Sequence, residues 1–227
     1  MKPGARFCPS PDDELTSQST FVERAQIPTP FGLFEMLLFR ERGTDIEHVA
    51  MVRGIVADAE KVLVRVHSEC ITGDLFGSLR CDCGDQLRLS LQKIQAEGRG
   101  VVVYLRQEGR GIGLANKLKA YNLQDHAGLD TVAANIALGF RPDERGFRPG
   151  AEILRQLEVR SVRLMTNNPG KVEALEKCGI RVVERVPVFA EARRENAFYL
   201  RTKAEQMGHD LPNSSQALDG DHEETKL

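Results

Sequence analysis

The hydrophobic pattern of this chain changes its period near residue 84, and this change limits the folds that the chain can adopt. Apolar runs separated by turn residues come first, and they indicate β-strands at 31–41, 48–56 and 61–70. Apolar residues then recur at helical spacing, which predicts helices at 85–98, 113–124, 130–140, 150–159, 169–179 and 195–208. Short apolar runs between these helices predict strands at 100–106, 161–166 and 180–188. We therefore predict an α+β fold, in which a β-rich N-terminal part precedes alternating helices and strands in a single domain.

The strand predicted over 61–70 has two chemically different faces, because successive strand side chains point to opposite sides of a sheet. One face is apolar and carries Val62, Val64 and Val66. The other is polar and carries Arg65, His67 and Glu69. A polar strand face of this kind is either a solvated edge or the wall of a site.

The composition is that of a globular protein with no general attraction to nucleic acid or membranes. Of the 227 residues, 41% are hydrophobic and 28% are charged, and the formal net charge is −2. No apolar stretch approaches the ~20 residues of a membrane-spanning helix, and the N-terminus has no apolar signal segment. We predict a disordered N-terminal segment over 1–20, a domain over 21–209 and a disordered acidic tail over 210–227. We also predict a cytoplasmic location, where reduced thiols favour metal binding or catalysis over disulfides.

Three of the five cysteines fall within fourteen residues, at Cys70, Cys81 and Cys83. Thiolates bind zinc readily, and three protein ligands leave one coordination position open for a water that the metal makes acidic. A fourth protein ligand would instead make the site structural, and isolated cysteines are often small buried hydrophobic residues. The clustering favours zinc.

Two glycine-containing loops that precede predicted helices could bind an anion. In "RQEGRGIGLANK", over 106–117, closely spaced glycines let backbone N–H groups approach a phosphate, and Arg106, Arg110 and Lys117 surround them. Glu108 in this loop could accept hydrogen bonds from a guanine edge or offset the neighbouring positive charge. The second loop is "TNNPGK", over 166–171. By contrast, the charged 141–150 segment is by itself typical of a solvated connector.

Taken together, "RVHSEC", "GDLFGSLRCDCGDQL", "RQEGRGIGLANKLKAY", "DTVAAN" and "TNNPGKVEAL" resemble the GTP cyclohydrolase II family, over roughly residues 24–208. This resemblance implies an enzyme that opens the imidazole ring of GTP, releases formate and pyrophosphate, and begins riboflavin biosynthesis. It implies one Zn²⁺ per subunit, Mg²⁺ with the triphosphate, and a homodimer.

The resemblance also implies roles for individual residues. The zinc ligands would be Cys70, Cys81 and Cys83. The GTP contacts would be Arg65, Val66, His67, Ser68, Glu69, Gln86, Glu108, Gly109, Arg110, Thr131, Thr166 and Lys171. The catalytic residues would be Asp143 as proton acceptor, Arg145 at the α-phosphate and Tyr121 in completing the reaction. This overrides the connector interpretation of 141–150, although "DERGF" departs there from the Tyr-Gly pair of many members.

Two rival functions stay open at this point. One is a homologue that opens the ring but retains the formyl group, against which Tyr121 argues mildly. The other is a zinc-stabilised RNA-binding module without catalysis. The second lacks the aromatic stacking platforms of such modules, because the chain has no Trp and only 6% aromatic residues. We therefore predict GTP as the substrate and no nucleic-acid or membrane partner.

Overall fold

The computed structural model describes residues 19–190 together with Arg193, Asn196 and Thr202. The helix predicted over 195–208 lies outside the described residues, apart from Asn196 and Thr202. The acidic tail predicted over 210–227 lies wholly outside them.

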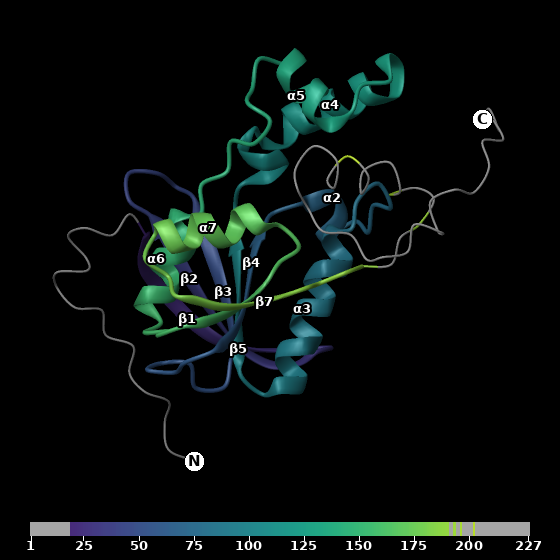
Figure 1. Cartoon of the computed structure of the whole chain (residues 1–227). Coiled ribbons are helices and arrows are strands. Elements are labelled where there is room, and N and C mark those ends of the chain that lie inside the picture. The colour runs from purple at the N-terminus through teal and green to yellow at the C-terminus, as the bar shows by residue number, and fades with distance from the viewer. Residues whose placement is uncertain (1–18, 191–192, 194–195, 197–201, 203–227) are drawn as a thin grey trace.

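A single mixed sheet of seven strands organises the described residues (Figure 1), in the order β1-β2-β3-β5-β4-β6-β7. The strands are β1 Ser19–Thr29, β2 Gly32–Glu41, β3 Glu47–Arg53, β4 Val62–Ser68, β5 Gly100–Leu105, β6 Val162–Met165 and β7 Val182–Val186. The first three form an antiparallel meander that continues antiparallel onto β5. Strands β5, β4, β6 and β7 are parallel to one another. The predicted α+β class, with its β-rich start, is confirmed.

Strand β1 is the strand that the sequence pattern did not reveal. It pairs with β2 from Ser19 opposite Glu41 to Thr29 opposite Gly32. It lies at the edge of the sheet, where Pro28 is tolerated because an edge strand can spare an N–H donor. Ser19 is fully buried, and its backbone nitrogen donates to the carboxylate of Glu152 over 3.0 Å. Ser19 and Thr20, which the sequence analysis placed in the N-terminal segment over 1–20, are the first two residues of β1.

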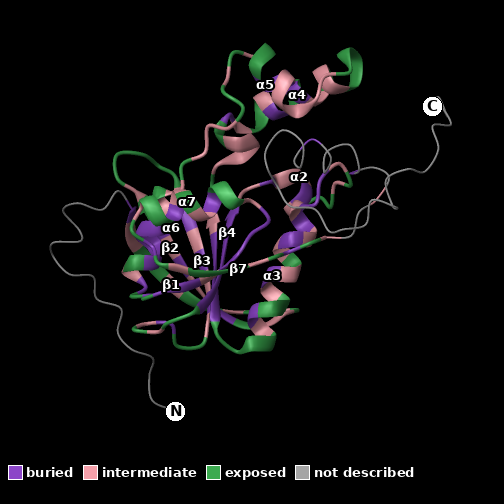
Figure 2. Cartoon of the chain, in the orientation of Figure 1, coloured by how far each residue is buried: buried purple, intermediate pink, exposed green. Residues whose placement is uncertain are grey.

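Helices cover both faces of the sheet. They are α2 Ile71–Asp74, α3 Cys83–Glu97, α4 Gly113–Ala127, α5 Thr131–Ala137, α6 Arg148–Gln156 and α7 Pro169–Lys177, with a 3₁₀ turn η1 at Glu108–Gly111. Apolar side chains of α6 and α7 pack on one face of the sheet, and Ile94 of α3 packs on the other. In contrast, α4 and α5 extend away from the sheet (Figure 1), and much of their surface is exposed (Figure 2).

Strand β4 lies in the interior of the sheet, between β5 and β6. Its three valines enter the core beneath α6 and α7, which confirms the predicted apolar face. Arg65 and His67 point to the opposite face, and both are buried. The polar face of this strand is therefore an internal wall. The parallel strands β4, β5 and β6 also end at the same edge of the sheet, where ligands of such sheets bind.

Two predicted helical faces are only partly correct. On α3 the buried positions are Gln86, Ser90 and Ile94, whereas Leu87 and Leu91 are only partly covered. On α4 the predicted apolar face is largely exposed, and the buried residues are Lys117 and Ala120. None of the described helices is both long enough and apolar enough to cross a membrane.

Candidate active site

The three clustered cysteines converge on one point at the carboxyl end of β4. Cys70 follows β4 and precedes α2, whereas Cys81 and Cys83 lie at the beginning of α3. Their sulfur atoms all lie within 4.8 Å of one another, and Cys70 Sγ lies 3.7 Å from Cys81 Sγ. Zinc–sulfur bonds of about 2.3 Å in a tetrahedral arrangement require sulfurs about 3.8 Å apart. The separation of this pair therefore fits a shared zinc ion.

Two glycines allow this convergence. A Cβ atom on Gly73 would lie 2.8 Å from Cys81 Sγ and 3.3 Å from Cys70 Sγ. A Cβ atom on Gly84 would lie 2.2 Å from the carbonyl oxygen of Gly73. Helix α2 can approach the beginning of α3 this closely because both positions lack a side chain.

The donor set has the chemistry of a zinc site with an open position. Among the residues that the structure describes, no further His, Cys, Asp or Glu joins the three thiols. Hydrogen bonds from the Cys81 and Cys83 thiols lower the pKa of Cys70, whereas hydrogen bonding to Cys70 raises the pKa of Cys81 to about 11. A divalent cation would favour ionisation of all three thiols.

A buried lysine lies against this cluster. Lys117 Nζ donates to Cys70 Sγ over 3.1 Å, to Thr72 Oγ1 over 2.9 Å and to Glu108 Oε1 over 2.8 Å. Burial lowers the pKa of Lys117, but the Cys70 thiolate and Glu108 outweigh it and leave that pKa raised. The ammonium is therefore charged at neutral pH.

Both carboxylate oxygens of Glu108 are bonded to groups of the same chain. Besides Lys117, they accept hydrogen bonds from the backbone nitrogens of Ile71, over 2.6 Å, and Gly109, over 2.7 Å. This geometry favours the charge-offsetting role among the two that the sequence suggested. The guanine contact of Glu108 stays a prediction.

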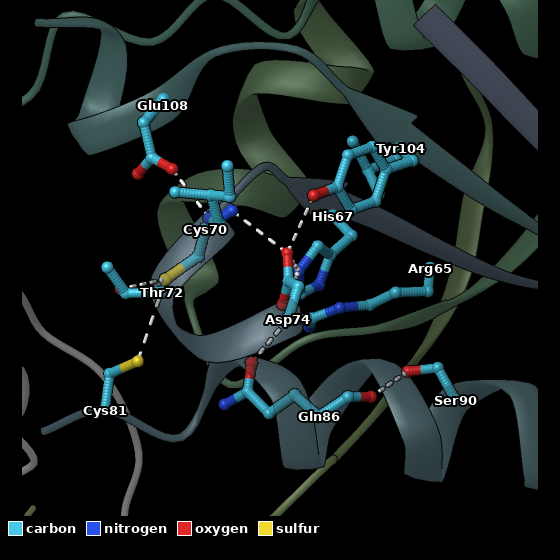
Figure 3. A network of polar contacts seen from close by, with 12 residues as sticks. Arg65, His67, Cys70, Thr72, Asp74, Cys81, Gln86, Ser90, Tyr104 and Glu108 are labelled. Atoms are coloured by element: carbon cyan, nitrogen blue, oxygen red, sulfur yellow. Dashed lines mark hydrogen bonds and ion pairs between the residues drawn. The ribbon is translucent and has the colours of Figure 1, made fainter. Parts of the chain in front are cut away.

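A second carboxylate, that of Asp74, supports the turn that carries Cys70 (Figure 3). Asp74 accepts hydrogen bonds from the Cys70 backbone nitrogen and the Tyr104 hydroxyl, each over 2.9 Å. His67 Nε2 lies 3.0 Å from Asp74 Oδ1, so this nitrogen carries the proton that Asp74 accepts. Burial lowers the pKa of His67 more than Asp74 raises it. The imidazole is therefore neutral, and its buried Nδ1 has no protein partner in the described part of the chain.

Polar side chains beneath the cysteines form a buried chain across β4 and α3. Arg65 donates to Gln86 Oε1 and, over 2.9 Å, to the carbonyl oxygen of Met165. Gln86 in turn donates to Asp82 over 2.6 Å. These contacts explain why α3 buries Gln86 while its leucines are only partly covered.

The cysteines line a pocket that encloses ≈ 1040 Å³ of space not filled by atoms, part of it open to solvent. Every predicted site residue lines this pocket except Val66 and Asp143. Val66 contributes through its carbonyl oxygen, which accepts a hydrogen bond from Lys171 Nζ over 2.9 Å. Asp143 is bonded to Arg145, which does line the pocket.

Arg110 presents an unused cationic group to the pocket. Its backbone has φ 61°, a left-handed conformation that costs a residue with a side chain about 1–2 kcal/mol. Its two terminal guanidinium nitrogens are buried, and no protein acceptor in the described ranges reaches them. Strained backbone and unpaired buried donors are typical of a position that holds a ligand, and an anion fits this one.

The proposed catalytic pair is preformed. Arg145 Nε donates to both carboxylate oxygens of Asp143, over 2.8 Å and 3.1 Å. Burial alone would raise the pKa of Asp143, but the hydrogen bonds and charge of Arg145 lower it. The carboxylate is therefore ionised at neutral pH. Burial raises the pKa of the third predicted catalytic residue, Tyr121, whose ring lies 4.4 Å from the Arg80 guanidinium carbon.

Sequence reasoning did not single out three residues that bear on the site. Lys117 appeared there only as one of several basic residues near a glycine loop, Asp74 appeared only within a quoted motif, and Thr72 did not appear at all. Helical spacing was the available signal, and it gave little information about these residues. Ile71–Asp74 is a single turn between two motifs, and Lys117 interrupts the predicted apolar face of α4. Their partners lie far away in the sequence.

A thiol cluster at the carboxyl ends of parallel strands, next to a pocket that Arg110 lines, is typical of metal-dependent enzymes that act on anionic substrates. Residues 20–187 match the sequence model of the GTP cyclohydrolase II family. The chain belongs to this family, which confirms the predicted resemblance.

Curated relatives of this chain support its membership of this family. The chain is 55% identical over 188 residues to GTP cyclohydrolase-2 of Actinobacillus succinogenes, covering 83% of this chain and 86% of the relative. It is 56% identical over 189 residues to GTP cyclohydrolase-2 of Haemophilus influenzae, covering 83% and 87%. It is 49% identical over 199 residues to the riboflavin biosynthesis protein RibBA of Porphyromonas gingivalis, covering 86% of this chain and 49% of that protein.

Proposed function

We propose that this chain hydrolyses GTP, opens the imidazole ring, and releases formate and pyrophosphate to leave a diaminopyrimidinone ribosylamine phosphate, the first step of riboflavin biosynthesis. The family and the names of the curated relatives support this reaction. The observation that carries the proposal is one pocket that combines the three thiols with the unpaired guanidinium of Arg110.

We propose that Cys70, Cys81 and Cys83 hold Zn²⁺, since their sulfur separations and the lack of a fourth ligand among the described residues suit an open site. When bound, zinc would supply a Lewis acid and an acidic water for attack on the guanine imidazole carbon. Mg²⁺ would enter with the triphosphate, because this ion is usually held by substrate phosphates rather than by a protein cage.

Other residues of the chain would bind the guanine base and the phosphates of the substrate. Arg110 would bind a phosphate oxygen, and Lys171 would add positive charge from its buried position on α7. Neutral His67 would offer Nδ1 as a hydrogen-bond acceptor to the substrate, because Asp74 fixes its tautomer. The other predicted GTP contacts, which line the same pocket apart from Val66, stay predictions.

The pairing of Arg145 with Asp143 sets an order of events for the phosphate chemistry. While the pair is intact, Asp143 orients Arg145 toward the pocket and is a weak base. A substrate phosphate that attracts Arg145 would loosen this ion pair and free Asp143 to accept a proton. Arg145 would then stabilise charge on the α-phosphate and the departing pyrophosphate.

We further propose a homodimer in the cytoplasm. Three large apolar side chains on the projecting helices support a contact between copies, because they are 38%, 47% and 57% exposed at Leu114, Leu118 and Ile136 respectively. The cytoplasmic location rests on the composition of the chain alone.

Product analysis tests the reaction. Zinc-loaded protein is incubated with GTP with and without a chelator, and products are identified by mass together with an assay for formate. The matched control is Cys81→Ser, which should lose both metal and turnover. Formate and the ring-opened product support the proposal. A product that retains the formyl group identifies the narrower homologue, whereas RNA binding without any turnover identifies the non-catalytic module.

A further inference from the structure

Lys117 is a buried charge that the reaction as described does not use. It lies on α4 with its side chain only 10% exposed. Its ammonium group has three hydrogens and three protein acceptors: Cys70 Sγ, Thr72 Oγ1 and Glu108 Oε1. Its donors are therefore already used, which argues against a phosphate-binding role for this lysine.

Of the three acceptors, the sulfur is the one that links Lys117 to the thiol cluster. Three thiolates around a divalent cation carry a formal charge of −1, and this excess weakens the cation as a Lewis acid. A charged donor on one sulfur withdraws electron density from that sulfur and cancels the excess charge. Glu108 adds an opposite charge nearby, but backbone N–H groups of Ile71 and Gly109 also bond to that carboxylate.

Neighbouring segments leave room for the Lys117 side chain and hold its ammonium group. A Cβ atom on Gly109 would lie 3.1 Å from Lys117 Cβ, so the glycine at the centre of the η1 turn leaves room for the lysine stem. Thr72 and Glu108 come from separate elements and hold the ammonium group in place. Because these contacts hold Nζ in one position, the hydrogen bond from Lys117 to Cys70 is a fixed part of the site.

We infer that Lys117 is a positioning residue that tunes the metal site: its ammonium donates to the Cys70 thiolate, lowers electron donation from that sulfur and so makes the bound metal a stronger Lewis acid. This inference rests on the zinc site of the proposed function. It assigns Lys117 no contact with the substrate.

Cobalt spectroscopy tests the inference without relying on activity. Co²⁺ can replace Zn²⁺ in thiolate sites and gives a sulfur-to-cobalt charge-transfer band whose energy reports electron donation by the sulfurs. Lys117→Met keeps the aliphatic stem and removes the donor, so the band should shift to longer wavelength. The matched control is Lys119→Met, because Lys119 is exposed on the same helix and its Nζ donates over 3.4 Å to Asn116 Oδ1, away from the thiol cluster. That variant should leave the band unchanged.

Turnover of the zinc-loaded enzyme provides a second readout. Loss of a group that supports a metal ligand costs about 10- to 100-fold in affinity or activity, and Lys117→Met should fall in this range. The Lys119→Met variant should turn over at the wild-type rate. If Lys117→Met does not fold, as judged by circular dichroism, E108Q/K117M removes both buried charges and should show the same spectral shift.

The outcomes separate the two claims. A wild-type protein without a thiolate charge-transfer band contradicts the proposed metal site itself. A wild-type band that stays unchanged in the folded Lys117 variant contradicts the inference and leaves the metal site standing. A shift in that variant and none in Lys119→Met supports it.

Discussion

Gly73→Ala should weaken zinc binding while leaving the fold intact. The new Cβ would lie 2.8 Å from Cys81 Sγ, 3.2 Å from Cys83 Cβ and 3.3 Å from Cys70 Sγ. The backbone of Gly73 is helical and its φ is negative, so alanine fits there and is favoured over glycine by about 1 kcal/mol. The strain is therefore confined to the thiol cluster.

The size of the effect follows from overpacking. An added methyl group in a tight site costs about 1–3 kcal/mol. Thiols without a metal can rotate away from it, but sulfurs held by a metal cannot, so the cost appears in binding. Since 1.4 kcal/mol corresponds to a tenfold change in the dissociation constant, zinc affinity should fall about 5- to 150-fold.

Competition with a chromophoric chelator measures the affinity, and thermal unfolding of the metal-free protein checks the fold. The matched control is Gly146→Ala, because a Cβ at Gly146 meets no atom of the described residues within 4 Å. Wild-type affinity in a folded Gly73→Ala protein would refute the claim that these three sulfurs close around one ion beside Gly73.

Three further outcomes follow from the pocket. Arg145→Ala should stop pyrophosphate release, and unchanged turnover would remove this arginine from the mechanism. Arg110→Gly relieves a left-handed backbone and removes the unpaired guanidinium. Its stability should therefore stay within about 1 kcal/mol of wild type. Its KM for GTP should rise about 10- to 150-fold, the equivalent of one charge-assisted hydrogen bond; an unchanged KM would contradict the assignment. Since Arg145 lowers the pKa of Asp143, the pair stabilises the fold above the unfolded carboxyl pKa of about 3.9 and loses this effect as the pH falls through the folded value. Denaturant unfolding across acidic pH should accordingly show a shallower decline for Asp143→Asn, and equal slopes would show that the pair adds no stability.

Local patterns predicted most elements of this fold, because the hydrophobic period and the positions of glycine and proline depend directly on backbone conformation. The helix predicted over 85–98 matches α3, and Gly98 ends it in a left-handed conformation, as its position indicated. The alternation on β4 correctly separated valines from Arg65 and His67. Strand β1 escaped notice because it lies at an edge, alternates weakly in burial and contains Pro28.

The polar support of the site could not be predicted because it depends on contacts between distant segments. Gln86 is buried because Arg65, on a strand 21 residues away, requires an acceptor. Lys117 is buried because Cys70 and Thr72, 47 and 45 residues earlier, surround its ammonium group. Helical spacing alone favoured Leu114 and Leu118, which the fold leaves exposed. Tertiary polar pairing thus overrode the apolar pattern at the site itself.

X-ray absorption at the zinc edge of the loaded protein tests most directly how the metal is held. Three sulfur scatterers at about 2.3 Å and one lighter oxygen scatterer are expected, as three cysteines and a solvent molecule require. Four sulfur or nitrogen ligands from the protein, or fewer than three sulfurs, would contradict an open three-thiolate centre and remove the basis for the proposed hydrolysis.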